Sequence, residues 1–178
     1  LDADEWVSRE LREAILGAKQ HRQFDAYTFK RLNGIAGRWM YYGGWYPDIK
    51  LRLGDRRCLG QGDSTTHDEL IPLPAASVGS MEGYLYHRTN ADFHDRMLTV
   101  NKLSTMAAHE LAQRGKRGHW SRVLLKPPFR FFQELILRRG FRDGFYGWAL
   151  AGSSAIYVFL REIKLLEQQR QLARPLQD

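Results

Sequence analysis

The hydrophobic pattern of this chain changes character near residue 92, and that change constrains the fold more than any other feature. Before it, apolar and polar residues alternate in short runs separated by glycine and proline, as in strands and loops. After it, apolar residues recur every three or four positions, which predicts helices. We therefore expect an α/β part at 1–90, a basic, amphipathic helical part at 91–170 and a frayed tail at 171–178.

The expected elements of the first part are short. Ser8 is a good N-cap for a helix that runs to about Lys19. Strands are expected at 26–33, 49–53 and 84–87, an irregular loop rich in glycine and aromatic residues at 34–47, and a turn at 60–63.

The second part is expected to hold three helices. They are predicted at 92–113 with Gly115 as the C-cap, at 129–139 up to Gly140, and at 144–169, with a short segment at 120–126 that Pro127 and Pro128 end. No charged residue occurs from 144 to 160. That run is shorter than the ~20 residues a membrane span needs, so a core helix and a helix lying in the membrane interface are the main alternatives.

The charge of the chain calls for an anionic partner or surface. The net charge is +7, and a dense basic segment holds only one acid, Glu134. Nucleic acid, anionic lipid and a phosphorylated substrate would all satisfy this charge. The single cysteine, Cys58, excludes an internal disulfide framework and a cysteine-rich zinc site. The basic residues of the segment are Arg114, Lys116, Arg117, Arg122, Lys126, Arg130, Arg138, Arg139 and Arg142.

Asp2 and Asp4 are the first candidates for chemistry. Two carboxylates two residues apart can both reach one hard cation where the chain turns out of a strand. Mg²⁺ and Mn²⁺ prefer such oxygen ligands and bring substrate phosphates with them. The alternative is a surface turn, because carboxylates are also favoured before a helix.

Three further places carry candidate side chains. The stretch Thr66–Leu70 contains His67, Asp68 and Glu69, any of which suits a general base, although a solvated loop has the same composition. The loop around Trp45 and Tyr46 suits sugar stacking or simple anchoring. His87, which ends an apolar strand, has the character of a structural residue.

Taken in order, five stretches resemble those of the inverting family 2 glycosyltransferases, most closely the bacterial lipopolysaccharide-core branch. They are LDADEWVSREL, GGWYPDIKLRL, THDEL, LYH and KPPFRFFQELILRRGFRDGFYGWALAGSSAIYVFL, and the resemblance covers nearly the whole chain. It implies a GT-A fold, which is a Rossmann-like α/β domain. It also implies a nucleotide-sugar donor, with a UDP-sugar as our expectation, and a Mg²⁺ or Mn²⁺ cofactor.

The resemblance also assigns roles to residues. Asp2 and Asp4 match the D-x-D motif, with Asp4 as the direct metal ligand. Asp68, which follows His67, is the expected general base in a single in-line displacement, and Glu69 is the alternative base.

On the acceptor side, the resemblance points to Trp45, Tyr46, Asp48 and Arg52 as substrate-binding residues. Gly54 departs from the family pattern, which often has an aromatic residue after the Arg-Leu pair. The acceptor is expected to be a saccharide or a lipid-linked saccharide of cell-envelope or lipopolysaccharide-core biosynthesis.

The resemblance has two consequences for the whole protein. The nucleotide-binding half of the family precedes its D-x-D motif, so we expect this chain to be the C-terminal part of a longer enzyme and to have little activity alone. We also expect a cytoplasmic enzyme held on the inner face of the plasma membrane. Arg130, Arg138, Arg139 and Arg142 would contact the anionic lipid surface.

Two other classes remain as alternatives. A non-enzymatic nucleic-acid binder accounts for the charge but leaves LDADEW and THDEL unexplained, and the chain contains no recognised nucleic-acid motif. A peripheral-membrane structural module accounts for the basic helices alone. Nucleic acid is therefore not an expected partner.

Overall fold

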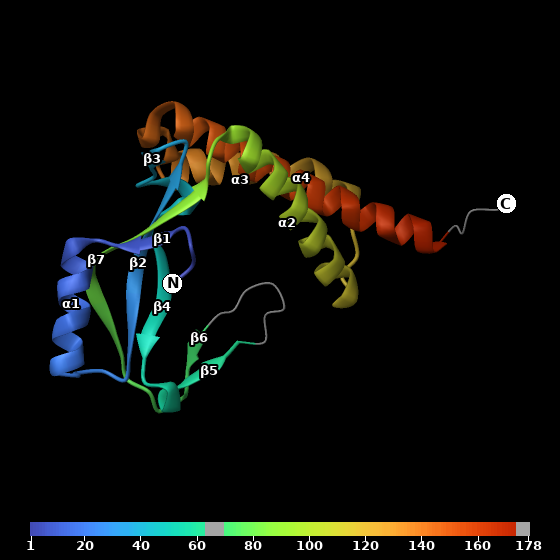
Figure 1. The fold of residues 1–178 in the computed structure, drawn as a ribbon. Coiled ribbons are helices and arrows are strands. Elements are labelled where there is room, and N and C mark those ends of the chain that lie inside the picture. Colours follow the sequence, from blue (N-terminus) through green and yellow to red (C-terminus); the bar gives the residue numbers. More distant parts are fainter. Residues whose placement is uncertain (63–69, 174–178) are drawn as a thin grey trace. The chain divides into compact units, whose positions relative to one another are not determined.

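The computed structural model describes residues 1–62 and 70–173, and the chain divides into two compact units. The sheet unit comprises Leu1–Tyr41 and Trp45–Thr89. The helical unit comprises Tyr42–Gly44 and the residues from Asn90 onward. Figure 1 shows the twisted sheet of the first unit and the long helices of the second. The expected combination of an α/β part and a helical part is confirmed.

The sheet unit is built from seven strands and one α-helix among the described residues. Five strands form one sheet in the order β1-β7-β2-β3, with β4 also paired to β2, and β5 and β6 form a separate hairpin. The elements are β1 (Glu5–Val7), α1 (Arg9–Gln20), β2 (Ala26–Ile35), β3 (Arg38–Trp39), β4 (Asp48–Gly54), β5 (Leu59–Gln61), β6 (Leu70–Pro72) and β7 (Val78–Asn90), with the short 3₁₀ turns η1 (Gly43–Trp45) and η2 (Arg56–Cys58).

The sheet contains both strand directions. β1 runs antiparallel to β7, and β3 and β4 run antiparallel to β2. β2 and β7 run in the same direction, because Thr28 near the start of β2 bonds to Gly79 and Asn33 near its end bonds to His87. The centre of the sheet is thus a parallel pair with antiparallel neighbours.

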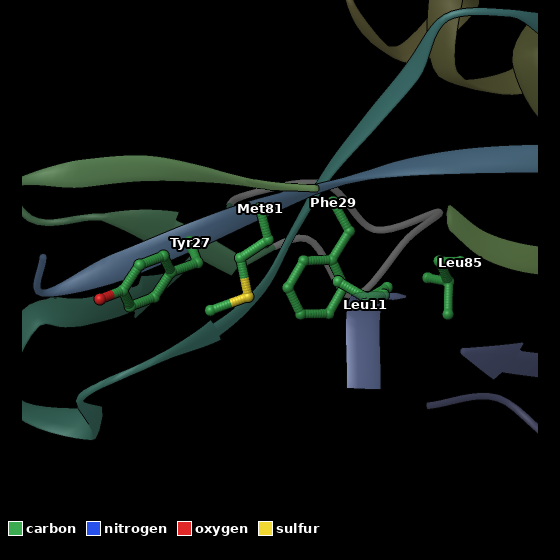
Figure 2. Packing of buried hydrophobic residues seen from close by; sticks show 5 residues of the cluster. All are labelled: Leu11, Tyr27, Phe29, Met81 and Leu85. Carbon is green, nitrogen blue, oxygen red and sulfur yellow. The ribbon is translucent and has the colours of Figure 1, made fainter. Parts of the chain in front are cut away.

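The core of this unit lies between α1 and one face of the sheet. Figure 2 shows its five most enclosed side chains, which come from α1, β2 and β7: Leu11, Tyr27, Phe29, Met81 and Leu85. The helix begins where expected, since the Ser8 hydroxyl accepts from the Leu11 amide at 3.2 Å. The same hydroxyl accepts from the Tyr84 amide of β7 at 3.1 Å, so the cap also joins the helix to the sheet.

Gly83 allows this close approach of α1 to β7. Its backbone has φ +91°, and a Cβ atom built there would lie 2.5 Å from the amide nitrogen of Leu11. Both the left-handed conformation and the missing side chain are therefore needed at this position.

Three expectations for this unit need correction. Gly60 and Gln61 belong to strand β5, which pairs with β6, rather than to a turn. Part of the expected loop forms a two-residue hairpin between β2 and β3, where Ala36 and Gly37 both have positive φ. The strand expected at 84–87 extends over Val78–Asn90, because β7 also lies along β2, where Thr28 bonds to Gly79.

Over residues 90–173, the helical unit contains three α-helices, and α2 and α3 both pack against α4, as Figure 1 shows. Its elements are α2 (Phe93–Gln113), α3 (Trp120–Phe132), the π-helical turn η3 (Gln133–Leu137), the 3₁₀ turn η4 (Gly140–Asp143) and α4 (Gly144–Ala173). Asp92 caps α2 by accepting from the Asp95 amide at 2.8 Å, and Gly115 follows its end with φ +69°, as expected.

Pro127 and Pro128 do not end a helix, contrary to expectation. Both lie inside α3, which continues to Phe132 and then widens into η3. The prolines remove the amides that would bond to the carbonyls of Val123 and Leu124, but their fixed φ is close to the helical value. The ion pair of Lys126 with Glu162 of α4, at 2.7 Å, helps to hold α3 in place at this point.

The uncharged run at 144–160 forms the first half of α4 and is partly buried. Leu150, Ala151, Ser153 and Val158 are enclosed in the unit, whereas other residues of the run remain exposed. Within residues 1–62 and 70–173, no helix is both long enough and apolar enough to cross a membrane.

Replacing Gly83 with alanine tests the packing of α1 on the sheet. We expect Gly83→Ala to lower the free energy of unfolding by about 3 kcal/mol, because the new methyl group meets backbone atoms in a strained conformation. Gly37→Ala is the matched control: its φ is also positive, at +75°, but nothing lies within 4 Å of the new Cβ. Urea unfolding should show a loss of only about 1 kcal/mol for the control. Equal losses would contradict the packing argument.

Candidate functional site

One face of the sheet changes from apolar to polar along its length. Side chains two residues apart on a strand share a face, so Arg31 and Asn33 follow Tyr27 and Phe29 on the face that carries α1. The strand pairings bring matching residues alongside them: Asp48 faces Arg31, and Glu5 faces His87. We call the resulting group the polar cluster, and it contains Asp2, Asp4, Glu5, Arg31, Asn33, Asp48, Lys50, Arg52, His87 and Thr89.

Glu5 is the buried centre of the polar cluster. Its side chain is fully enclosed, and its carboxylate lies 3.2 Å from Nη1 of Arg31 and 3.6 Å from Nη2 of Arg52. The Asp2 amide also donates to it at 3.3 Å. Burial by itself would raise the pKa of Glu5, but the Asp2 amide and the two arginines outweigh it and lower the pKa below its ordinary value. Glu5 is therefore a fixed negative charge.

Asp48 is the second carboxylate that Arg31 holds. Nε of Arg31 lies 2.7 Å from Oδ2 of Asp48, and the side-chain amide of Asn33 donates to the same oxygen at 3.1 Å. Lys50 approaches the other oxygen at 3.5 Å. Burial acts to raise the pKa of Asp48, but the Asn33 bond and the charge of Arg31 lower it. Arg31 thus joins β1 to β4 across the sheet through two carboxylates.

Asp4 is held by a chain of hydrogen bonds that starts in β2. Asn33 donates its amide hydrogens to Asp48 and to the Trp45 carbonyl, which leaves its oxygen facing Nδ1 of His87 at 2.8 Å. Nε2 of His87 then lies 3.2 Å from Oδ2 of Asp4. Both ring nitrogens of His87 face oxygen atoms, so the ring links Asn33 of β2 to Asp4.

Asp2 and Asp4 keep their carboxylates at the surface. The side chain of Asp2 is 66% exposed and that of Asp4 is 49% exposed, so each can take further ligands from solvent. Arg52 approaches Asp2 at 3.5 Å, and its buried Nε has no hydrogen-bond partner among the described residues. Within 1–62 and 70–173, no three metal-ligating side chains gather in one place. A cation here would need ligands from a substrate as well.

Trp45 and Tyr46, the aromatic residues predicted to bind the acceptor, have different partners in the structure. The Trp45 carbonyl reaches the polar cluster through Asn33. Tyr46 instead bonds to the hydroxyl of Tyr84; burial, followed by this bond, raises the pKa of Tyr46. Tyr84 and Tyr86 alternate with Leu85 and His87 along β7, so they lie on the opposite face of the sheet. On that face Tyr86 packs with Trp6 and Trp39, whose ring centroids are 5.8 and 4.9 Å from its own.

The glycine pair of GGWYPD has a separate role, inside the helical unit. The Gly44 amide donates to the carboxylate of Glu134, and the Gly43 amide donates to the Arg138 carbonyl at 3.0 Å. A side chain on Gly44 would collide with the Glu134 carboxylate. Glu134, which is buried, is therefore an anchor for this loop.

The structure brings together some of the residues predicted from the sequence. Asp2, Asp4, Asp48 and Arg52 lie in the polar cluster, and His87 orients Asp4. The predicted base residues His67, Asp68 and Glu69 lie outside the described residues. Glu5, Arg31 and Asn33 were missed, although the alternation of Phe29, Arg31 and Asn33 along one strand was a usable signal.

Arg31 is the most sensitive residue of the polar cluster. Arg31→Met should lower the free energy of unfolding by about 3 kcal/mol, because it leaves two partly or fully buried carboxylates without their main partner. The control is Arg9→Met, which breaks an exposed ion pair with Glu13 in α1 and should change stability by less than about 0.5 kcal/mol. Denaturant unfolding at neutral pH measures both, and similar losses would contradict this role of Arg31.

Comparison with known proteins finds a relative that is named as a glycosyltransferase. The chain is 31% identical, over an alignment of 186 residues, to a protein of Rhizobium meliloti (strain 1021) named lipopolysaccharide core biosynthesis glycosyltransferase LpsC. The alignment covers 98% of this chain and 65% of that protein, so the chain spans less than two thirds of the relative's length. No family model matches the chain, and no solved structure matches it. The chain is thus similar, over nearly its whole length, to part of a protein that is named as a glycosyltransferase.

Proposed function

We propose that this chain forms the metal-binding and acceptor-binding part of a glycosyltransferase. The observation that carries the proposal is the polar cluster, which joins residues of LDADEW, PDIKLRL and LYH at one end of one sheet face. These three stretches lie far apart in the sequence, and a surface turn alone does not require them to meet. The similarity to the Rhizobium protein supports the same class of reaction.

The proposed cofactor is Mg²⁺ or Mn²⁺, and the residues present suit such an ion. Asp2 and Asp4 offer hard carboxylate oxygens that remain open to solvent, and hard divalent cations use one or two carboxylates together with substrate phosphates and water. Asp4 would be the direct ligand, oriented by His87, and Asp2 would be the second. The bound ion would supply positive charge for a diphosphate leaving group.

The proposed reaction is a single displacement at the anomeric carbon of a nucleotide sugar, for which we favour a UDP-sugar. The acceptor hydroxyl oxygen forms a bond to that carbon while the bond from the carbon to the diphosphate oxygen breaks, which inverts the configuration. The hydroxyl proton passes to a general base, and we propose Asp68, with Glu69 as the alternative and His67 beside them. This assignment rests on the family resemblance.

The acceptor would be a saccharide or lipid-linked saccharide of the cell envelope, as in lipopolysaccharide-core synthesis. We propose Arg52 as an acceptor contact on the basis of the resemblance, and its side chain is 21% exposed beside Asp2. Trp45 and Tyr46 remain proposed acceptor contacts on the basis of the resemblance. Asp48 acts mainly through its neighbours, because its oxygens already accept from Arg31 and Asn33 and face Lys50.

The single substitutions Asp4→Asn and Asp68→Asn, made in the intact protein, test this proposal. Each variant should lower sugar transfer from nucleotide sugar at least about 100-fold, because one removes a metal ligand and the other the base. Glu13→Gln, on the exposed side of α1, is the control and should leave the rate unchanged. Full activity of both aspartate variants would contradict the roles proposed for these residues. No sugar transfer by the unchanged protein, together with salt-sensitive nucleic-acid binding, would support the nucleic-acid alternative instead.

A further inference from the structure

The outward side of α3 and η3 is apolar, which reverses the usual arrangement of a surface helix. Leu125, Phe129, Phe132 and Ile136 recur at helical spacing, and each is more than half exposed. Two basic residues of the same segment pair with buried acids. Lys126 pairs with buried Glu162 at 2.7 Å, and Arg130 pairs with buried Glu134 at 2.7 Å.

A second apolar stripe lies along α4. Phe145, Trp148, Ile156 and Phe159 are exposed and recur at intervals of three, eight and three residues, which keeps them on one side of the helix. Contacts at both ends of α3 place it beside α4. The ring centroids of Phe131 and Trp148 are 6.1 Å apart, and the Arg170 guanidinium carbon lies 5.6 Å from the ring centroid of Trp120. We call the exposed residues of both stripes the apolar face: Leu125, Phe129, Phe132, Ile136, Phe145, Trp148, Ile156 and Phe159.

The segment that carries part of the apolar face also presents positive charge. Arg122, Arg138, Arg139 and Arg142 are exposed, and Arg142 covers the ring of Tyr42 at 4.8 Å. Within 114–142, every residue of which the structure describes, the only acid is Glu134, whose side chain is 4% exposed. Of the four predicted lipid-binding arginines, Arg130 and Arg138 both pair with this acid, at 2.7 and 3.7 Å, but Arg138 remains exposed together with Arg139 and Arg142.

We propose that the apolar face inserts into the interfacial zone of an anionic lipid bilayer, with α3 and α4 lying along the membrane surface. The apolar side chains enter the boundary between headgroups and acyl chains, and Arg138, Arg139 and Arg142 contact lipid phosphates. The aromatic residues Trp148 and Phe129 suit this zone. The proposal does not depend on the transferase assignment, since it concerns attachment rather than chemistry.

The charge around the apolar face favours a bilayer over a second copy of the chain or a nucleic acid as its partner. A second copy of this chain would bring an arginine-rich rim against an identical rim, and like charges across an interface are unfavourable. Nucleic acid would complement the arginines but would leave the exposed leucine and phenylalanine side chains in contact with polar phosphates and sugars. An anionic bilayer satisfies both the charge and the apolar area.

Vesicle flotation of the intact protein tests the attachment. The protein should float with phosphatidylcholine vesicles that contain phosphatidylglycerol, and roughly tenfold less with phosphatidylcholine alone. The double variant Phe129→Gln/Phe132→Gln should reduce the partition coefficient roughly tenfold or more. The matched control is Leu98→Gln on α2, since Leu98 is 58% exposed and Phe129 is 63% exposed; it should stay within about twofold of the unchanged protein.

Depth-dependent quenching distinguishes insertion from simple charge attraction. Lipids brominated on the acyl chain should quench tryptophan fluorescence in the bound protein, and Trp148→Phe should remove a large part of that quenching. Flotation that salt abolishes completely, without any quenching, would overturn the inserted arrangement. A protein that stays unbound and dimerises, with Phe129→Gln/Phe132→Gln restoring the monomer, would instead assign the apolar face to a second copy of the chain.

Discussion

The ion pairs of Arg31 organise the sheet unit. A carboxylate as enclosed as that of Glu5 is tolerated only with a charged partner, and Arg31 provides one while also binding Asp48. These contacts fix the end of β1 against β2 and β4, immediately next to Asp2 and Asp4. A buried charge pair is weak evidence for high stability, and its more useful effect here is to hold two surface carboxylates in a defined place.

The same sheet face therefore serves two purposes along its length. At one end, Phe29 and Leu85 pack under α1 and hold the unit together. At the other end, Arg31 and His87 replace apolar side chains and orient carboxylates toward solvent. In the helical unit, the buried acids Glu134 and Glu162 are neutralised internally, which leaves the outward side of α3 apolar and the exposed charges of 114–142 positive. Proposed chemistry and proposed attachment thus belong to different units.

Helix caps could be predicted from the sequence, whereas contacts between distant strands could not. Ser8 predicted a helix start because a cap needs only the next three residues. The polar cluster could not be predicted in full, because it depends on strand register between residues such as Arg31 and Glu5, which are 26 positions apart. The anchor of Gly44 on Glu134 spans 90 positions. Pro127 misled the prediction because packing against α4 outweighed the missing amides.

Binding of Mn²⁺ tests the central claim most directly, because it reports on the polar cluster without requiring an acceptor or turnover. Electron paramagnetic resonance of the intact protein with Mn²⁺ and a nucleoside diphosphate should show a bound ion. Its affinity should fall at least about tenfold in Asp4→Asn and stay unchanged in Glu13→Gln. Equal Mn²⁺ affinity in the unchanged protein and in Asp4→Asn would contradict the assignment of this sheet end as a metal and diphosphate site.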